Sequence, residues 1–211
     1  MKLIKSLVAG AALFTSFFAN SALISLNPTA DIWTWDGGAN NDTELRINDY
    51  GTYNQAILAM FDLGALNGST INSATFSMYR YDGYNSLGLN VGAYQLIAGW
   101  NVSTGAVPAY NATAVDFENI TTNGWYNWDI TSLVSNWVSG SVTNYGLAFI
   151  GSGPSRFQRF YASEAAQLMP VLNVDYTATQ QQPASDVPAP APLALLGLAL
   201  LAIGRRKFLT K

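Results

Sequence analysis

The chain has 211 residues and a formal net charge of −3, with 11% charged and 13% aromatic residues. This length fits one domain with short additional segments, and the aromatic content is too high for a disordered polar chain. The sequence contains no Cys and no His, which excludes disulfides and thiol chemistry and removes the usual general base and the commonest zinc ligand.

Charge is unevenly distributed along the chain. Six of the ten basic residues lie near the two ends, whereas residues 23–186 contain four arginines and all 13 acidic residues. The formal charge of this central region is therefore −9. Because such a region repels polyanions, we predict that it does not bind nucleic acid.

The N-terminus has the pattern of a secretory signal peptide. Two lysines within the first five residues precede a mainly apolar segment, residues 7–18, and small residues follow at Ser21 and Ala22. The apolar segment is too short to cross a membrane comfortably as a permanent anchor. We therefore predict a signal peptide over residues 1–22, cleaved near Ser21 or Ala22 on export.

Residues 23–178 show the alternation of apolar and polar side chains that is typical of half-buried strands. The clearest stretches are residues 75–78, 89–93 and 172–176. Further strand candidates are residues 43–48, 55–62, 125–130, 145–150 and 157–162. Turn-rich segments separate them, so the sequence predicts an all-β fold, an antiparallel β-sandwich or jelly roll.

One segment within this region has helical rather than strand spacing. Leu133, Val134, Trp137 and Val138 recur at the interval of one helix face within residues 129–138. A polar residue, Asp129 or Thr131, can cap the start, and Gly140 can end the segment. We predict a single short helix that closes one end of the sandwich, with Trp137 in the core.

Exposed aromatic residues are the candidates for ligand contact, because sugar C–H groups pack against aromatic faces while nearby polar groups bond the hydroxyls. Trp33 and Trp35 are two positions apart and share a strand face, ahead of a Gly/Asn loop. Tyr79, Tyr81 and Tyr84 cluster before a turn. The alternative for any one of these residues is a place in the core.

A loop rich in side-chain oxygens follows the two tryptophans. Asp36, Asn40 and Asp42 lie close together beside two glycines, and Ca²⁺ prefers several oxygen ligands. The spacing matches no fixed calcium motif, and Asx-rich loops commonly cap their own backbone. We therefore predict no cofactor and keep a structural Ca²⁺ at this loop as the alternative.

Catalysis would have to rely on carboxylates or tyrosine. The carboxylate pairs Asp116 with Glu118 and Asp42 with Glu44 are each two residues apart in a strand or a loop, and in a strand each would share a face, as a glycosidase pair would require. Tyr161 with Arg159 is the corresponding candidate for a polysaccharide lyase. Solvated surface charge explains these residues more simply, and we predict that the chain is not an enzyme.

The C-terminal part of the chain changes character. Residues 179–192 form a linker of Gln, Pro and Ala that cannot pack as a strand. The following segment, residues 193–203, consists almost wholly of Leu, Ala and Gly and predicts a short apolar helix. It is marginal for a permanent span, and the Arg205-Arg206 pair after it would stay on the cytoplasmic side of a membrane.

The last residues, 187–211, resemble a PEP-CTERM sorting signal. The resemblance rests on Pro188 and Pro190, the Leu/Ala-rich segment, and the Arg205-Arg206 pair, with Ala189 standing where the family has Glu. It implies a protein exported across the inner membrane of a Gram-negative bacterium that makes extracellular polysaccharide. An exosortase-type enzyme and a transient contact with the inner membrane are the implied partners.

The central region resembles the DNRLRE-domain family of secreted β-sandwich modules of carbohydrate-binding type. Asp42, Leu45 and Arg46 match the motif that names the family. Other landmarks occur in the family's order, at residues 58–63, 71–76, 128–131, 144–148, 160–164 and 170–176.

This second resemblance implies a surface or extracellular-matrix protein that contacts extracellular polysaccharide. The ligands of some relatives are acidic polymers, which the charge of −9 on residues 23–186 opposes unless a cation bridges the two. The alternatives are a structural adhesion or biofilm component without a defined sugar ligand and, less favoured, a polysaccharide lyase or hydrolase.

Overall fold

The computed structural model describes residues 21–178, apart from residues 36, 50–53, 84–87 and 154–156. The predicted signal peptide up to residue 20, the linker and the sorting tail lie outside the described residues. Within the part of the chain that is described, no helix combines the length and the apolar character needed to cross a membrane.

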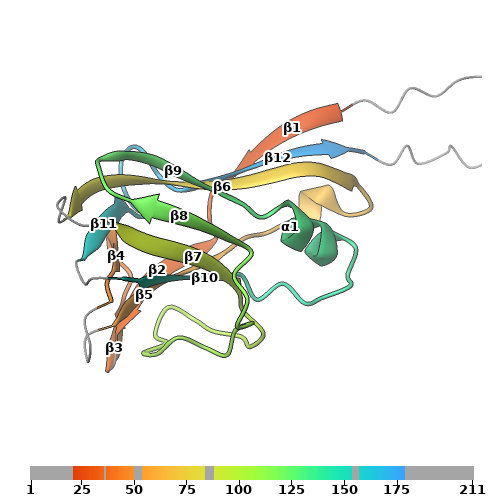
Figure 1. Cartoon of the computed structure of the whole chain (residues 1–211). Helices are drawn as coiled ribbons and strands as arrows, with labels where there is room; N and C mark the ends of the chain where they lie inside the picture. Colours follow the sequence, from red (N-terminus) through yellow and green to blue (C-terminus); the bar gives the residue numbers. More distant parts are fainter. Residues whose placement is uncertain (1–20, 36, 50–53, 84–87, 154–156, 179–211) are drawn as a thin grey trace, which may run out of the picture. The chain divides into compact units, whose positions relative to one another are not determined.

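The described residues form two antiparallel sheets (Figure 1). Sheet A has the order β1-β12-β6-β11-β4, with β9 also paired to β6. Its strands are β1 (Ser21–Leu26), β4 (Glu44–Ile47), β6 (Thr70–Gly83), β9 (Gly124–Asp129), β11 (Gln158–Tyr161) and β12 (Val171–Thr177). Sheet B has the order β3-β2-β5-β10-β7-β8. Its strands are β2 (Ala30–Trp35), β3 (Gly38–Asn40), β5 (Gln55–Met60), β7 (Leu89–Gln95), β8 (Asp116–Ile120) and β10 (Leu147–Ser152).

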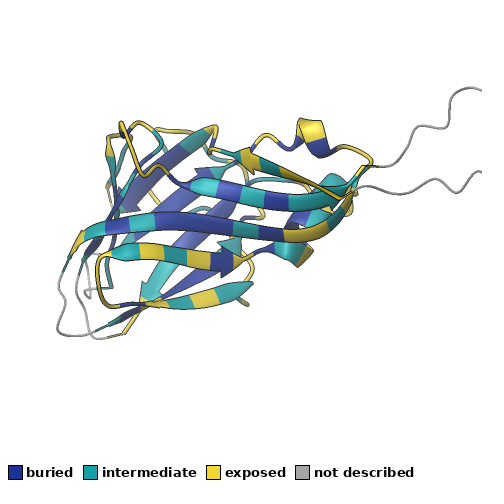
Figure 2. Cartoon of the chain, turned by 90° about the horizontal axis from the view of Figure 1, so that it is seen from above, coloured by how far each residue is buried: buried dark blue, intermediate teal, exposed yellow. Residues whose placement is uncertain are grey.

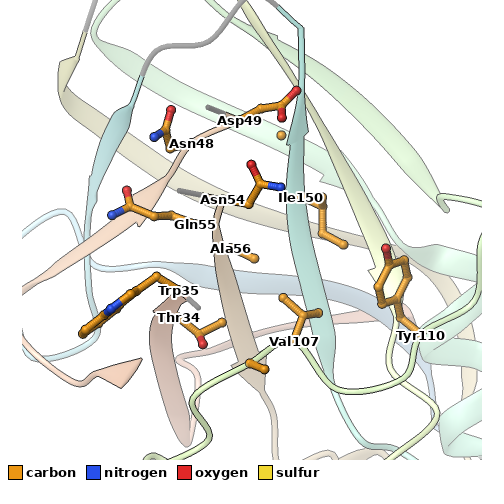
Figure 3. Close-up of a pocket in the computed structure, with 12 residues that line it drawn as sticks. Thr34, Trp35, Asn48, Asp49, Asn54, Gln55, Ala56, Val107, Tyr110 and Ile150 are labelled. Atoms are coloured by element: carbon orange, nitrogen blue, oxygen red, sulfur yellow. The ribbon is translucent and has the colours of Figure 1, made fainter. Parts of the chain in front are cut away.

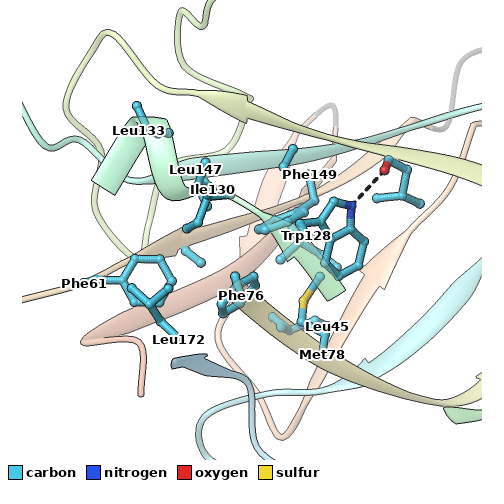
Figure 4. Packing of buried hydrophobic residues seen from close by; sticks show 14 of the residues in the cluster. Leu45, Phe61, Phe76, Met78, Trp128, Ile130, Leu133, Leu147, Phe149 and Leu172 are labelled. Carbon is cyan, nitrogen blue, oxygen red and sulfur yellow. Dashed lines mark hydrogen bonds between the residues drawn. The ribbon is translucent and has the colours of Figure 1, made fainter. Parts of the chain in front are cut away.

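The hydrophobic core lies between the two sheets. It combines Phe76 and Trp128 from sheet A with Phe149 from sheet B, and all three side chains are fully buried (Figure 4). The Trp128 indole Nε1 also donates a 3.0 Å hydrogen bond to the carbonyl oxygen of Val91 in β7, which ties the two layers together. Burial alternates along strands of sheet A such as β4 and β11 (Figure 2), and two antiparallel sheets enclose the core, so the predicted all-β sandwich is confirmed.

Strand β6 organises sheet A because it is long enough to pair with three other strands. Its first part pairs with β12 and its last residues pair with β11. On the stretch between Thr75 and Arg80 it also pairs with β9, where Tyr79 lies opposite Trp125. Residues that are distant in the sequence are thereby brought onto one face of sheet A.

The predicted helix is confirmed as α1 (Thr131–Val138). Leu133, Val134 and Trp137 are buried in the core, as the spacing predicted. Asp129 accepts hydrogen bonds from the Thr131 backbone N–H, at 2.9 Å, and from the Thr131 hydroxyl, at 2.6 Å. After the helix, Gly140 has a φ of +73°, the left-handed conformation that favours Gly at a helix end.

The outer face of sheet B is partly covered by the connection between β7 and β8, residues 96–115. Leu96 joins Ile32, Leu58 and Ala148 in a second buried apolar cluster on this face. The Trp100 indole Nε1 donates a 2.8 Å hydrogen bond to the carbonyl oxygen of Tyr145 and fixes the connection in place. Central strands of sheet B are consequently buried on both sides.

The strands expected from the alternation are all present. Most of their ends agree to within two residues, whereas the stretch 75–78 is part of the much longer strand β6, which extends five residues further at each end. Strands β1 and β3 were not predicted from the sequence. Residues 116–120, for which both a strand and a loop were considered, form strand β8. A 3₁₀ turn (Gly64–Leu66) follows β5. Strand β1 starts at Ser21 and pairs with β12, so the residues predicted to flank the cleavage site, Ser21 and Ala22, lie in a strand.

Candidate functional site

Four aromatic side chains form a continuous row on the outer face of sheet A. Tyr79 and Tyr81 project from β6, alternating with Met78, which faces the core. Trp125 comes from β9 and Tyr161 from β11. We call these four residues the aromatic strip. The strip brings side chains from three strands that are far apart in the sequence onto one surface.

The rings of the strip contact one another in sequence across the sheet. The ring centroids of Trp125 and Tyr79 are 5.5 Å apart, edge to face. Tyr79 and Tyr161 are 6.1 Å apart, and Tyr161 and Tyr81 are 4.6 Å apart, both stacked. Trp125 is 43% exposed and the three tyrosines are half-buried. The ring contacts restrict each side chain, so the row has a fixed shape before any ligand arrives.

A change of register places Tyr161 in the row. Strand β11 pairs with β6 so that Arg159 lies opposite Asp82 and Phe160 opposite Arg80, with a β-bulge between these pairs. A bulge re-aims the side chains that follow it. Phe160 points into the core, and Tyr161 therefore points outward between the two tyrosines of β6.

Charged side chains border the strip at the β4 edge. The Tyr81 hydroxyl donates a 2.5 Å hydrogen bond to Glu44 Oε2, and Arg46 Nε donates to Glu44 Oε1 at 2.7 Å. Arg159 lies between two carboxylates, with Nη1 3.3 Å from Asp82 Oδ2 and Nε 3.8 Å from Glu44 Oε2. The two arginines and two carboxylates balance, which leaves this border without net charge.

These contacts set the protonation states at the border. Burial by itself would raise the pKa of Glu44, but the hydrogen bonds from Tyr81 and Arg46 outweigh it and lower that pKa. Burial, and then the neighbouring Glu44 carboxylate, raise the pKa of Tyr81. Glu44 is therefore held ionised and Tyr81 protonated at neutral pH. In these states Glu44 cannot act as a general acid and Tyr81 cannot act as a general base.

Neutral polar groups lie at the other side of the strip. On β6 the Ser77 hydroxyl donates a 2.7 Å hydrogen bond to Asn127 Oδ1 of β9. These two residues are opposite each other in the pairing of β6 with β9, two positions along the strands from Tyr79 and Trp125. A flat aromatic surface flanked by amide, hydroxyl and carboxylate groups can pack against sugar rings and bond their hydroxyls.

A buried arginine supports the strip from beneath. Arg80 is fully buried between Tyr79 and Tyr81 in the sequence, and its side chain lies on the opposite side of β6. Its Nε donates to Gln158 Oε1 at 2.5 Å and its Nη1 to Asn123 Oδ1 at 2.6 Å. Burial is the main cause that lowers its pKa. These bonds hold the turn after β8 and the start of β11 against β6.

The structure separates the aromatic residues that the sequence had singled out. Tyr79 and Tyr81 lie together in the strip. Trp33 is only 6% exposed and packs in the core, with its ring 4.7 Å from that of Trp35 and the Arg46 guanidinium 4.9 Å from its centroid. Trp33 therefore has no free face for a ligand, and Trp35 is half-buried against it. Tyr84 lies outside the described residues.

The sequence reasoning did not include Trp125, and it considered Tyr161 only for catalysis. Trp125 could have been found, because it is three residues before Trp128 on one strand. Positions three apart point to opposite faces, so a core Trp128 puts Trp125 outside. Tyr161 could not be placed beside Tyr79 in this way, because its neighbour depends on the β-bulge between β11 and β6, in which Tyr81 of β6 is the extra residue.

The residues considered for calcium do not converge within the described part of the chain. Asp36 lies outside the described residues, and Asn40 lies in β3, paired with Trp33. Asp42 Oδ1 accepts the Thr43 backbone N–H at 2.6 Å, which is the self-capping alternative. Among described residues no group of three or more Asp or Glu side chains is arranged to hold a metal ion.

The carboxylate pair considered for catalysis is used for structure. Asp116 and Glu118 share a side of β8, and burial, followed by the charge of Asp116, raises the pKa of Glu118. Asp116 Oδ2, however, accepts the Asp129 backbone N–H at 2.8 Å, and Oδ1 accepts the Phe117 N–H. Asp116 thereby joins β8 to the last residue of β9, just before helix α1.

Comparison with known proteins agrees with the chemistry of this surface. No curated protein matches the chain. The family model described as carbohydrate-binding module family 96 matches residues 22–176, which include every strand that contributes to the strip and nearly the whole sandwich. The chain belongs to carbohydrate-binding module family 96.

Proposed function

We propose that this protein is an exported, non-catalytic surface or extracellular-matrix protein that binds polysaccharide through the aromatic strip of sheet A. The single observation that carries this proposal is the unbroken row of Trp125, Tyr79, Tyr161 and Tyr81. Membership of a carbohydrate-binding family gives the ligand class. The row supplies the surface, because several aligned rings can contact successive sugars of a chain.

Local charge favours a neutral polysaccharide. Arg46 and Arg159 are the cations nearest the strip, and both are engaged by Glu44 or Asp82. The central region as a whole carries −9. A polyanionic chain would meet repulsion from the domain, and among the described residues no unengaged cation at the strip would offset it.

The absence of catalysis is part of the proposal. A hydrolase or lyase needs an acid and a base poised beside the bound chain. At the strip, the Tyr81 hydroxyl and the Arg46 guanidinium already bond the Glu44 carboxylate, so these groups are engaged with one another and not directed at a bound chain. Incubating the protein with each bound polysaccharide should release neither reducing ends nor unsaturated products.

Export and sorting rest on the sequence of the two ends. The lysine-containing start and apolar segment within residues 1–22 support export through the inner membrane. The resemblance of residues 187–211 to a PEP-CTERM signal supports an exosortase-type partner and transient membrane contact, at the envelope of a Gram-negative bacterium. The DNRLRE-type landmarks support placement at the outer surface or in the matrix. A structural Ca²⁺ is not part of the proposed mechanism.

The test is affinity electrophoresis of the purified protein in gels that contain xyloglucan, galactomannan or dextran, with polygalacturonate and hyaluronan as acidic comparators. Trp125→Ala and Tyr161→Ala should each weaken binding about two- to tenfold, from the 0.5–1.5 kcal/mol of an aromatic contact. Leu23→Ala, which truncates a 74% exposed apolar side chain on β1, is the control and should bind normally.

Two results would overturn the proposal. One is a protein that no polysaccharide retards. The other is a pair of strip variants that bind as tightly as the unmodified protein. Sugar-insensitive self-association, measured by sedimentation, would in either case favour the structural adhesion component instead.

A further inference from the structure

A cleft lies on the face of the sandwich opposite the strip. Its floor is formed by Thr34, Ala56 and Ile150, which are partners in one row across β2, β5 and β10. On each strand the neighbouring residue, such as Ile57 or Phe149, faces the core. The floor therefore faces away from the core, on the outer side of sheet B.

The two walls of the cleft differ in chemistry (Figure 3). Asn48, Asp49, Asn54 and Gln55, from the segment that joins β4 to β5, form a polar wall. Val107 and Tyr110, from the connection between β7 and β8, form an apolar wall. The enclosed volume is about 300 Å³, at the lower end of the range for small-molecule sites.

The polar wall is held by the backbone of the sheet. Asn48 and Gln55 exchange two backbone hydrogen bonds of 3.1 and 3.0 Å, an isolated bridge that joins the end of β4 to the start of β5. Asp49 Oδ2 accepts the Gly153 N–H at 3.0 Å, which ties the same segment to the end of β10. The amide side chains are thus presented from a fixed edge of the cleft.

Aromatic surface continues from the cleft to the edge of sheet B. Tyr94 contacts Tyr110 and Phe117 edge to face, with ring centroids 5.3 and 6.3 Å away. These rings lie over Gly92, where a Cβ atom would come within 2.7 Å of Tyr94 and 2.8 Å of Phe117. Tyr110 is 40% exposed and Phe117 is 56% exposed. A chain that leaves the cleft would pass along these rings.

The lining fits an uncharged sugar. Amide and hydroxyl groups bond sugar hydroxyls, and the Tyr110 ring offers an apolar face. The described lining residues include one carboxylate, Asp49, and no Lys or Arg. An anionic sugar would therefore find no positive partner at this cleft.

We propose that the cleft is a second glycan-binding site and that the module cross-links two polysaccharide chains, one on each outer face. This inference rests on the proposed function of the strip. The core separates the two sites, and packed sheets lie about 10 Å apart. A stretch of chain bound along one face cannot also lie in the cleft of the other, so simultaneous binding joins separate chains or distant segments of one chain.

The test uses agarose beads coated with the neutral polysaccharide that most retards the purified protein in the electrophoresis panel. The unmodified protein should agglutinate the beads. Tyr110→Ala, Asn54→Ala and Trp125→Ala should each still be retarded in the gel but should lower the agglutination titre about two- to tenfold, because cross-linking needs both sites and each change weakens one of them. Asn54 is exposed, so Asn54→Ala tests the role of the cleft even if Tyr110→Ala fails to fold. Leu23→Ala should agglutinate normally.

The outcomes separate the two proposals. If no polysaccharide retards the unmodified protein, the proposed function fails and this inference fails with it. If the protein binds and Trp125→Ala weakens binding, but the cleft variants agglutinate beads normally, the strip stands and the second site is refuted. Normal agglutination by Trp125→Ala would assign cross-linking to self-association and would also refute the two-face arrangement.

Discussion

Replacing the buried carboxylate Asp31 by asparagine should stabilise the protein at neutral pH. Asp31 is fully buried at the start of β2, where its carboxylate accepts the Ser163 backbone N–H at 3.0 Å and the Ser163 hydroxyl at 2.6 Å. Burial raises the pKa of Asp31 from 3.8 to about 6, against the lowering effect of the Ser163 bonds, and the charge of Glu164 raises it further.

The sign of the pH dependence follows from this direction. Between pH 3.8 and about 6 the folded protein keeps the Asp31 proton that the unfolded chain has released. The contribution of Asp31 to stability therefore falls as the pH rises through this window and is constant above it. A shift of about two units corresponds to about 3 kcal/mol of free energy at neutral pH.

The variant Asp31→Asn can keep the local bonds without the charge. The oxygen of the new side-chain amide can accept the Ser163 N–H, and its nitrogen can donate to the Ser163 hydroxyl. The hydroxyl lies 3.2 Å from Glu164 Oε2 and can donate its own proton to that oxygen. We expect the variant to gain up to about 3 kcal/mol at pH 7.5, or about 2–4 °C in Tm per kcal/mol. The gain should vanish below pH 4.

Thermal and urea unfolding of both proteins at pH 4, 5, 6 and 7.5 is the assay. The matched control is Asp62→Asn, which neutralises an exposed carboxylate and retains an oxygen for the Gly64 N–H. Taking the difference between variant and unmodified protein removes the pH dependence of the other carboxylates. A variant less stable than the parent at pH 7.5, or a difference independent of pH, would refute the assignment of an unfavourable buried charge.

Three other predictions concern the fold and the metal. Trp128→Phe should lower the free energy of unfolding by about 1–3 kcal/mol in urea titrations, because it leaves the Val91 carbonyl without its indole donor. Gly146→Ala should reduce the yield of soluble protein and destabilise what folds by more than about 2 kcal/mol, because φ is +83° and a Cβ atom there would overlap the Ala59 carbonyl oxygen; normal expression and Tm would contradict this. Calcium at 5 mM or EDTA, followed by differential scanning fluorimetry, should leave Tm unchanged, whereas a calcium-dependent rise would restore the calcium alternative.

Local patterns in the sequence were sufficient to predict the elements of this fold. Alternation located β6, β7 and β12, and the change to helical spacing located α1 together with its terminal Gly140. These signals depend only on near neighbours in the chain, so they can be recognised without knowing which strands pair with each other. The signal failed at β1 and β3, the short or terminal strands that carry few core side chains.

Pairing between strands that are distant in the sequence determined the site. The register of that pairing cannot be predicted from local patterns in the sequence. Tyr79 was found because it belongs to a local cluster, but Tyr161 joins it only through the register shift between β11 and β6. Trp33 was misplaced for a related reason. The connection of residues 96–115 covers part of sheet B, so buried residues occur on both faces of β2 and alternation no longer tells inside from outside.

The two proposed glycan surfaces differ in how they are built, and this should divide their roles. The strip is made of side chains on paired strands, locked by ring contacts of 4.6–6.1 Å. Little conformational entropy is lost when a chain binds it. The cleft takes its walls from residues beside and within connecting segments, among them Asn48, Asn54 and Val107, and its amides can bond sugar hydroxyls in specific positions. Because a flat aromatic face tolerates many sugars whereas placed amides do not, exchanging the sugar should change binding at the cleft more than at the strip. Selectivity would then reside on sheet B, and removing the cleft should leave the broad range of polysaccharides that the strip binds while abolishing cross-linking.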